Sequence, residues 1–104
     1  MKEKNEILIQ AEIIQALRKM GCIAERRVPY KAGMSDIVAS IDGKWTAIEV
    51  KTDNGHLTPL QALYRDRIIA SGNIYVVCRS KEDAIALVEK VRNGSNGNSL
   101  PAPF

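Results

Sequence analysis

The pair Asp42-Gly43 separates two runs rich in β-branched and aromatic residues, 36–41 and 44–51. An Asp-Gly pair in this setting is the strongest short-range signal for a β-hairpin, because both central residues of the tight turn need a positive φ. A two-residue loop also sets the register, so Ile41 faces Lys44 and the pairing continues outward from there. We therefore expect Asp36 to face Glu49 across the hairpin.

This pairing places two acidic side chains on one face of the sheet. Directly opposite residues have Cβ atoms about 4.5–5.5 Å apart, so the carboxylates of Asp36 and Glu49 repel each other unless a cation lies between them. Lys51 shares their face because strand side chains alternate with period two. Oxygen ligands of this kind suit Mg²⁺ or Mn²⁺, and the backbone carbonyl of Val50 is a further candidate ligand.

The three side chains together predict a site for phosphoryl chemistry. A divalent cation there would polarise a phosphoryl oxygen and activate a water molecule. Lys51 would orient or deprotonate that water, or stabilise the transition state as a cation. The alternative is an ion pair between Glu49 and Lys51 on a strand face, worth about 0–1 kcal/mol, with Asp36 in the preceding turn.

The remaining segments predict the order α-β-β-β-α-β-α. The segment Thr58-Pro59-Leu60-Gln61 predicts the start of a helix. Thr58 can cap it, Pro59 suits its first position and Gln61 completes a capping box. The apolar run 74–78 is typical of a strand that is covered on both faces. The other expected elements are a helix over 7–20, an exposed edge strand over 23–29 and a helix over 81–92.

Composition limits the classes of protein that fit. A chain of 104 residues has room for one domain, and 45% hydrophobic with 26% charged residues is typical of a globular fold. The net charge of +3 permits attraction to phosphates without demonstrating it. Two distant cysteines exclude a disulfide framework, and no membrane span or signal segment is visible, which predicts a reducing, cytoplasmic setting. Both thiols are expected to be buried and free.

Three motifs carry a resemblance to a known family. They are Gly33-Met34-Ser35-Asp36, the strand ending in Ile48-Glu49-Val50-Lys51, and Gly55-His56-Leu57-Thr58-Pro59-Leu60-Gln61. With the leading Glu6-Ile7-Leu8-Ile9-Gln10, the chain resembles the PD-(D/E)XK nuclease superfamily, and within it the VRR-NUC (virus-type replication-repair nuclease) family. The resemblance extends to about Arg92. Ser35 stands where many members have proline, and His56 stands where Lys or Arg is common.

The resemblance implies an α/β, restriction-endonuclease-like αβββαβ core with a mixed four-stranded sheet flanked by helices, plus a C-terminal helix. Residues 1–92 would form this domain and 93–104 a disordered tail. Asp36 and Glu49 match the family's Mg²⁺ or Mn²⁺ ligands, Lys51 its catalytic lysine and Gln61 the glutamine that positions phosphate or water. Glu6 matches the acidic residue of the first helix, although Glu12 on the same helix is the alternative.

Basic and aromatic residues near the motifs are candidates for DNA contacts. Arg26, Arg27 and Lys31 lead into the site, and Arg65 follows on the second helix. A solvated edge strand is the alternative for the first three. Tyr64 lies one helical turn after Gln61, where it would meet a base or pack against the core. Trp45 lies on the carboxylate side, where it would wall the cleft or, as we expect, be buried in the core.

The implied function is a metal-dependent DNA endonuclease. The family's small stand-alone members suggest a homodimer acting on branched DNA such as Holliday junctions, in a bacterial or phage-infected cell. One alternative is a restriction-like or repair nuclease that acts on duplex, flap or nicked DNA. A second alternative, from another class, is a non-catalytic module that only binds nucleic acid.

Overall fold

The order of helices and strands predicted from the sequence is confirmed. The computed structural model describes residues 5–28 and 32–94, so Lys31 and residues 95–104 of the expected tail lie outside the described residues. The elements are α1 (Glu6–Lys19), β1 (Ile23–Arg26), β2 (Ile37–Ile41), β3 (Lys44–Val50), α2 (Pro59–Ala70), β4 (Ile74–Cys78) and α3 (Lys81–Arg92).

The hairpin forms with the predicted register. Asp42 and Gly43 adopt φ values of 51° and 83°, as a tight turn between two antiparallel strands requires. Ile41 pairs with Lys44, and the ladder continues to the pair Ile37 and Ile48. Asp36 directly precedes β2, so this register carries it to the position opposite Glu49.

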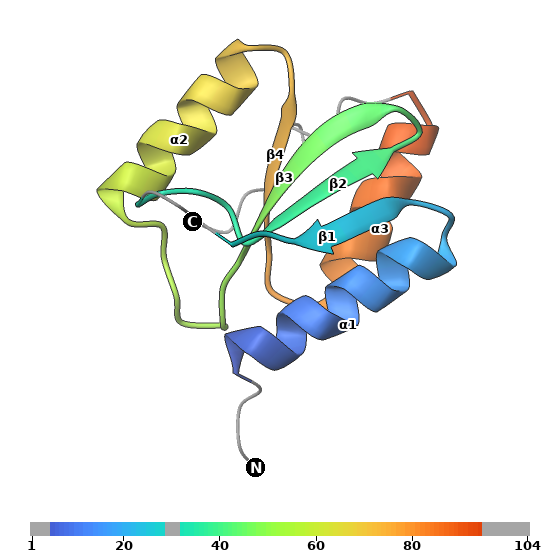
Figure 1. Ribbon diagram of the computed structural model, residues 1–104, viewed down its shortest axis with the longest axis horizontal. Coiled ribbons are helices and arrows are strands. Elements are labelled where there is room, and N and C mark those ends of the chain that lie inside the picture. Colours follow the sequence, from blue (N-terminus) through green and yellow to red (C-terminus); the bar gives the residue numbers. More distant parts are fainter. Residues whose placement is uncertain (1–4, 29–31, 95–104) are drawn as a thin grey trace.

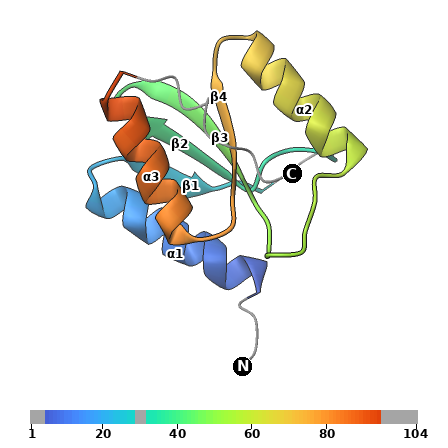
Figure 2. The same ribbon diagram turned by 180° about the vertical axis from the view of Figure 1, so that it is seen from behind.

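The four strands form one mixed sheet in the order β1-β2-β3-β4. The first three are antiparallel neighbours, and β4 runs parallel to β3. A parallel pair needs a crossover connection, which α2 and its flanking loops supply. Figures 1 and 2 show that α2 lies on one side of the sheet and α1 and α3 lie on the other.

The larger core lies between the sheet and the helices α1 and α3. It contains alternate residues of the strands, such as Ile37 and Ile48, packed against Ile13, Leu17 and Leu87 of those helices. A smaller cluster occupies the opposite face, where Ala47, Tyr75 and Val77 meet partly buried side chains of α2 and the preceding loop. Glu49 follows Ala47 by two residues, so its side chain belongs to the α2 face.

Two expectations about the sheet need correction. The expected edge strand forms, but it was expected over 23–29 and β1 ends at Arg26, with Val28 87% exposed. Trp45 was expected in the core, but it is 37% exposed. The cause is that β4 begins opposite Thr46, so no β4 residue lies beside Trp45.

The cysteine prediction is confirmed, since Cys22 and Cys78 are buried and free. Among the helices in the described part of the chain, none combines the length and the apolar character needed to cross a bilayer.

Candidate active site

The N-terminus of α2 orients Gln61. Thr58 caps the helix, and its hydroxyl accepts a 3.2 Å hydrogen bond from the Gln61 backbone N–H. The Gln61 side-chain oxygen accepts a 2.9 Å hydrogen bond from the Thr58 backbone N–H, so the predicted capping box is confirmed. The box leaves the amide nitrogen of Gln61 free to turn toward the sheet. There it donates a 3.1 Å hydrogen bond to Oε2 of Glu49.

Asp36 is held against the end of β3. Its Oδ2 accepts a 2.9 Å hydrogen bond from the backbone N–H of Val50. Its backbone carbonyl accepts a 2.8 Å hydrogen bond from the N–H of Arg27, which carries the pairing of β1 and β2 one residue beyond β1. The carboxylate is therefore fixed on the α2 face beside Glu49.

Glu49 is a buried carboxylate with an unsatisfied oxygen. Only 2% of its side chain is exposed, because α2 covers this part of the sheet. Oε2 contacts Gln61 and lies 3.8 Å from the Nζ of Lys51. Oε1 is also buried, and no donor among residues 5–28 and 32–94 bonds to it. Burying an oxygen without a hydrogen-bond partner costs folding free energy, and a bound proton or cation would remove that cost.

Burial raises the pKa of Glu49 from 4.5 to about 8. The nearby carboxyl group of Asp36 raises the pKa further, through its negative charge and through the hydrogen bond that a protonated Glu49 would make to it. Lys51 acts in the opposite direction, and the charge of Glu6 adds a small increase. The predicted conflict between Asp36 and Glu49 is therefore present in the structure.

Lys51 is held by the loop that follows β3. Its side chain is 11% exposed, and its aliphatic stem lies against Gly55, where an added Cβ would come within 3.3 Å of the lysine Cδ. The loop turns tightly, since the Gly55 N–H bonds to the carbonyl of Thr52. The guanidinium of Arg79 donates to the carbonyls of Thr52 and Asp53. These contacts keep the ammonium beside Glu49.

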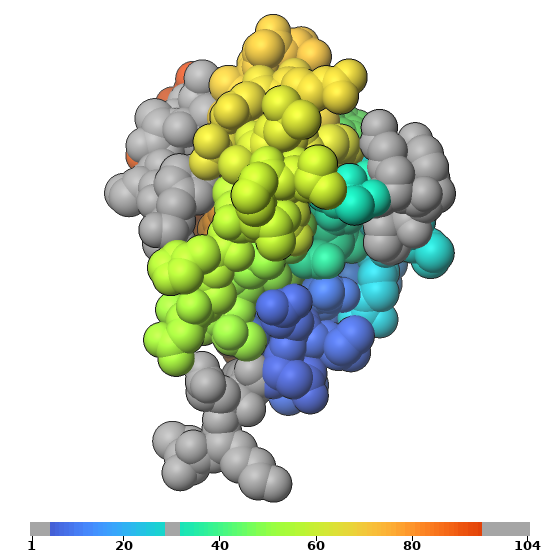
Figure 3. Space-filling view, turned by 90° about the vertical axis from the view of Figure 1, so that its left-hand side faces the viewer, coloured from blue at the N-terminus to red at the C-terminus, as the bar shows by residue number. Residues whose placement is uncertain are grey.

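The structure distinguishes the two acidic candidates on α1. Glu6 occupies the first turn, which Asn5 caps, and its charge acts on Glu49. Glu12 lines a separate small cavity with Asp53 and Arg79. Figure 3 shows the start of α1 (blue), the loop after β3 (green) and α2 (yellow) next to one another on this side of the molecule. Glu6 is thus the α1 carboxylate whose charge acts on Glu49, and the role of either residue in the site stays a prediction.

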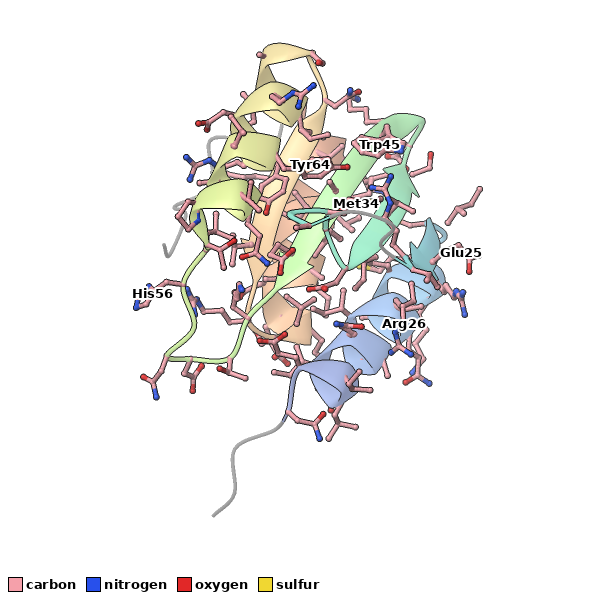
Figure 4. All side chains as sticks on the ribbon, turned by 60° about the vertical axis from the view of Figure 1, so that its left-hand side comes forward. Glu25, Arg26, Met34, Trp45, His56 and Tyr64 are labelled. Atoms are coloured by element: carbon pink, nitrogen blue, oxygen red, sulfur yellow. The ribbon has the colours of Figure 1, made fainter. Side chains whose placement is uncertain are left out.

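The two neighbouring arginines point to opposite faces of the sheet. Arg26 donates from Nε to the Gln10 side chain at 2.9 Å, so it is directed to α1 and away from the carboxylates. Arg27 donates from Nη1 to the Tyr64 hydroxyl at 2.8 Å, on the α2 face. Figure 4 shows Arg26 beside α1 and Tyr64 between α2 and the sheet. Arg65 is paired with its neighbour Asp66 at 2.9 Å.

No set of three or more His, Cys, Asp or Glu side chains is grouped closely enough to hold a metal ion in the described ranges. The ligand set predicted from the sequence has two carboxylates and the carbonyl of Val50. It stays a prediction.

The comparisons with known proteins bear on the fold. No family model matches the sequence, and no curated protein matches it either. A solved structure described as a VRR_NUC domain is similar to it, with a TM-score of 0.71 and 21% sequence identity over 81% of this chain and 94% of that chain. The chain has the VRR_NUC fold.

This likeness confirms the predicted fold class. The mixed four-stranded sheet with three flanking helices has the architecture of a VRR_NUC structure, so the resemblance that the motifs suggest is borne out at the level of the fold. The VRR_NUC fold is a nuclease-type fold. Chemistry, however, depends on particular side chains and has to be argued from them.

Proposed function

We propose that this chain is a nuclease that hydrolyses DNA phosphodiester bonds with the help of Mg²⁺ or Mn²⁺. The observation that carries the proposal is the buried Oε1 of Glu49, which lies in a carboxylate pair with Asp36 and receives no hydrogen bond from the described residues. A nuclease-type fold around that pair supports the assignment.

The residues present fit a hard divalent cation. Oδ2 of Asp36 and Oε2 of Glu49 are each held by an N–H donor, so the other oxygen of each carboxylate would bind the cation. The carbonyl of Val50 would be a third ligand, and water would complete the shell, as is usual for Mg²⁺. The cation would replace the proton that the pair otherwise needs.

The surrounding side chains suit phosphodiester hydrolysis. When bound, the cation polarises a phosphoryl oxygen and lowers the pKa of a water molecule. Lys51 holds a positive charge next to Glu49, where it stabilises the negative charge that develops on the phosphate or orients the attacking water. Gln61 fixes the orientation of the Glu49 carboxylate, and Glu6 adds negative charge at the edge of the site.

The finer proposal concerns the substrate and the assembly. Branched DNA such as a Holliday junction is proposed from the motif resemblance. Cutting two strands of a four-way junction needs two sites, which a C2 homodimer would supply. The rival substrates are linear duplex, flap and nicked DNA.

The deciding experiment compares cleavage of labelled four-way junction, flap, nicked and linear DNA in Mg²⁺, Mn²⁺ and EDTA. We expect cleavage only with metal, fastest on the junction, and none by Glu49→Gln. Equal rates on all substrates would remove the preference for branched DNA and leave the nuclease. A wild-type protein that binds DNA and never cuts it would be the non-catalytic module.

Metal binding has a separate test that does not depend on activity. We expect Mn²⁺ to raise the melting temperature of the wild type because it binds only the folded chain. Asp36→Asn keeps an oxygen for the Val50 N–H but lowers the ligand charge, so its melting temperature should rise less. Equal shifts in the two proteins would show that Asp36 is not a ligand.

A further inference from the structure

Three charged side chains form a row across the sheet. Asp36 continues the β2–β3 register to face Glu49, and the Arg27 N–H bonds to the Asp36 carbonyl, so Arg27 faces Asp36 on the other side. Residues that face each other in a ladder lie on the same face of a sheet. The row Arg27–Asp36–Glu49 therefore lies on the α2 face, with the arginine at its β1 end.

Helix α2 contacts both ends of this row. Gln61 donates to Glu49, and Tyr64, three residues later and on the same side of the helix, accepts from Arg27. No residue of α2 is fully buried, so these polar contacts add to the partly exposed apolar packing of Tyr64 and Ile68 that joins the helix to the sheet. The position of Arg27 is thereby linked to the position of the carboxylates.

The Tyr64 hydroxyl is used as an acceptor, which leaves its own proton available. Its oxygen accepts the Nη1–H of Arg27 at 2.8 Å. The ring is fixed by an edge-to-face contact with Tyr75, with the ring centroids 6.4 Å apart and an interplanar angle of 72°. Arg27 thus has further N–H groups beside the one that bonds to Tyr64, and the hydroxyl proton of Tyr64 lies at the same place.

No carboxylate neutralises Arg27 in the described part of the chain. Three other arginines there are paired with acids, Arg18 with Glu25, Arg65 with Asp66 and Arg92 with Asp42. Arg27 is half-buried, and within the described part of the chain its side chain donates to the neutral Tyr64 hydroxyl. A guanidinium held in place by a neutral acceptor keeps its charge for an anion.

We propose that Arg27 and Tyr64 form a binding site for a backbone phosphate of the substrate, next to the phosphate that is hydrolysed. The inference rests on the proposed function. The guanidinium turns toward α2 and not toward the carboxylates, so it takes a neighbouring phosphate. Tyr64 positions Arg27 and donates its own O–H to the same group. The pair thereby fixes the register of the DNA strand over Asp36 and Glu49.

The test measures DNA affinity over a series of salt concentrations in EDTA, by fluorescence anisotropy of a labelled duplex and a labelled four-way junction. Arg27→Gln should weaken binding about tenfold and lower the slope of log K against log salt by about one. Tyr64→Phe keeps the ring and every charge, so it should weaken binding less and leave the slope unchanged. The double variant with Arg27→Gln and Tyr64→Phe should bind DNA about as weakly as Arg27→Gln alone, because the two residues bind one phosphate together.

Arg26→Gln is the matched control. It removes the same charge one residue away, but this guanidinium is tied to α1 on the other face. We expect it to leave affinity and slope close to those of the wild type. Equal effects of the two arginine variants would overturn the proposal, and so would additive effects of Arg27→Gln and Tyr64→Phe.

Thermal unfolding and DNA cleavage by the wild type are measured alongside binding. Thermal unfolding checks that each variant folds. If Arg27→Gln does not fold, Arg27→Lys takes its place, and we expect it to keep the salt slope and weaken binding. A wild type that cuts DNA, with Arg27→Gln equal to Arg26→Gln, would refute the phosphate site alone. A wild type that never cuts, with the expected binding pattern, would refute the nuclease and retain the phosphate site.

Discussion

Oε2 of Glu49 accepts a 3.1 Å hydrogen bond from Gln61 and lies 3.8 Å from the ammonium of Lys51, whereas Oε1 of the same carboxylate receives no bond from the described residues. One oxygen of the buried carboxylate is thus held by this chain, and the other is left without a donor from the described residues. This asymmetry determines how the site responds to pH, to substitution and to divalent ions.

Without metal, the protein should become less stable as pH rises from about 4.5 to about 8. Folding raises the pKa of Glu49 from 4.5 to about 8, so within this range the folded state holds a proton that the unfolded chain has lost. The free energy of unfolding then falls with pH, and this group contributes no further change above pH 8. Urea unfolding in EDTA at pH values below, within and above the range measures the decline.

Glu49→Gln is the control for that series. The amide does not titrate and has nearly the same shape, so the decline should be absent. If wild type and variant lost stability in parallel across the range, another group would be responsible, and the raised pKa of Glu49 would be contradicted.

Gln61→Ala should lower the free energy of unfolding by more than Thr58→Ala, which removes only the helix cap. Thr58→Ala deletes a capping side chain, which costs about 1 kcal/mol. Gln61→Ala also deletes half of the capping box and leaves Oε2 of the buried Glu49 without its amide donor, which costs roughly 1–3 kcal/mol more. The excess should be largest above pH 8, where Glu49 is charged, and urea unfolding of both variants measures it. Equal losses would mean that Gln61 acts only through the cap.

Much of this site can be predicted because turn chemistry sets the register of a hairpin. Once Asp42-Gly43 is placed in a two-residue turn, Asp36 and Glu49 have to face each other, and the period of two puts Lys51 beside them. The capping box in Thr58–Gln61 likewise predicts where α2 begins. These local rules act over a few residues, so the sequence alone contains them.

Long-range packing accounts for what sequence reasoning missed. Trp45 was expected in the core because it lies on the same face of the hairpin as the carboxylates. Its exposure depends on where β4 begins, and no local pattern indicates that position. One local rule was also overlooked: Arg26 and Arg27 were grouped as one basic cluster, although the alternation of a strand already places neighbours on opposite faces. The effect of the Glu6 charge on Glu49 depends on the position of α1 relative to β3, which only the folded chain supplies.

Gly33→Ala should disturb the site through α2. The residue has a φ of +90°, and an added Cβ would lie 2.8 Å from the carbonyl oxygen of Leu60, in the first turn of α2. The left-handed backbone costs of order 1–3 kcal/mol for other residues, and the clash moves the turn that carries Gln61. Gly43→Ala is the control, because it has a similar φ of +83° with open space around it. Thermal unfolding should show the larger loss for Gly33→Ala; equal losses would mean that strain alone matters.

Lys51→Ala should separate DNA binding from cleavage. The variant removes the ammonium beside Glu49, so we expect cleavage in Mn²⁺ to fall by about 10²–10³-fold, while DNA affinity in EDTA changes little because other basic residues remain. Lys51→Met keeps a stem to pack against Gly55 and tests whether the loss comes from charge or from packing. Gel-based cleavage and anisotropy measure the two effects. A Lys51→Met protein that cuts at the wild-type rate would show that the ammonium has no part in the reaction and that its place beside Glu49 is structural.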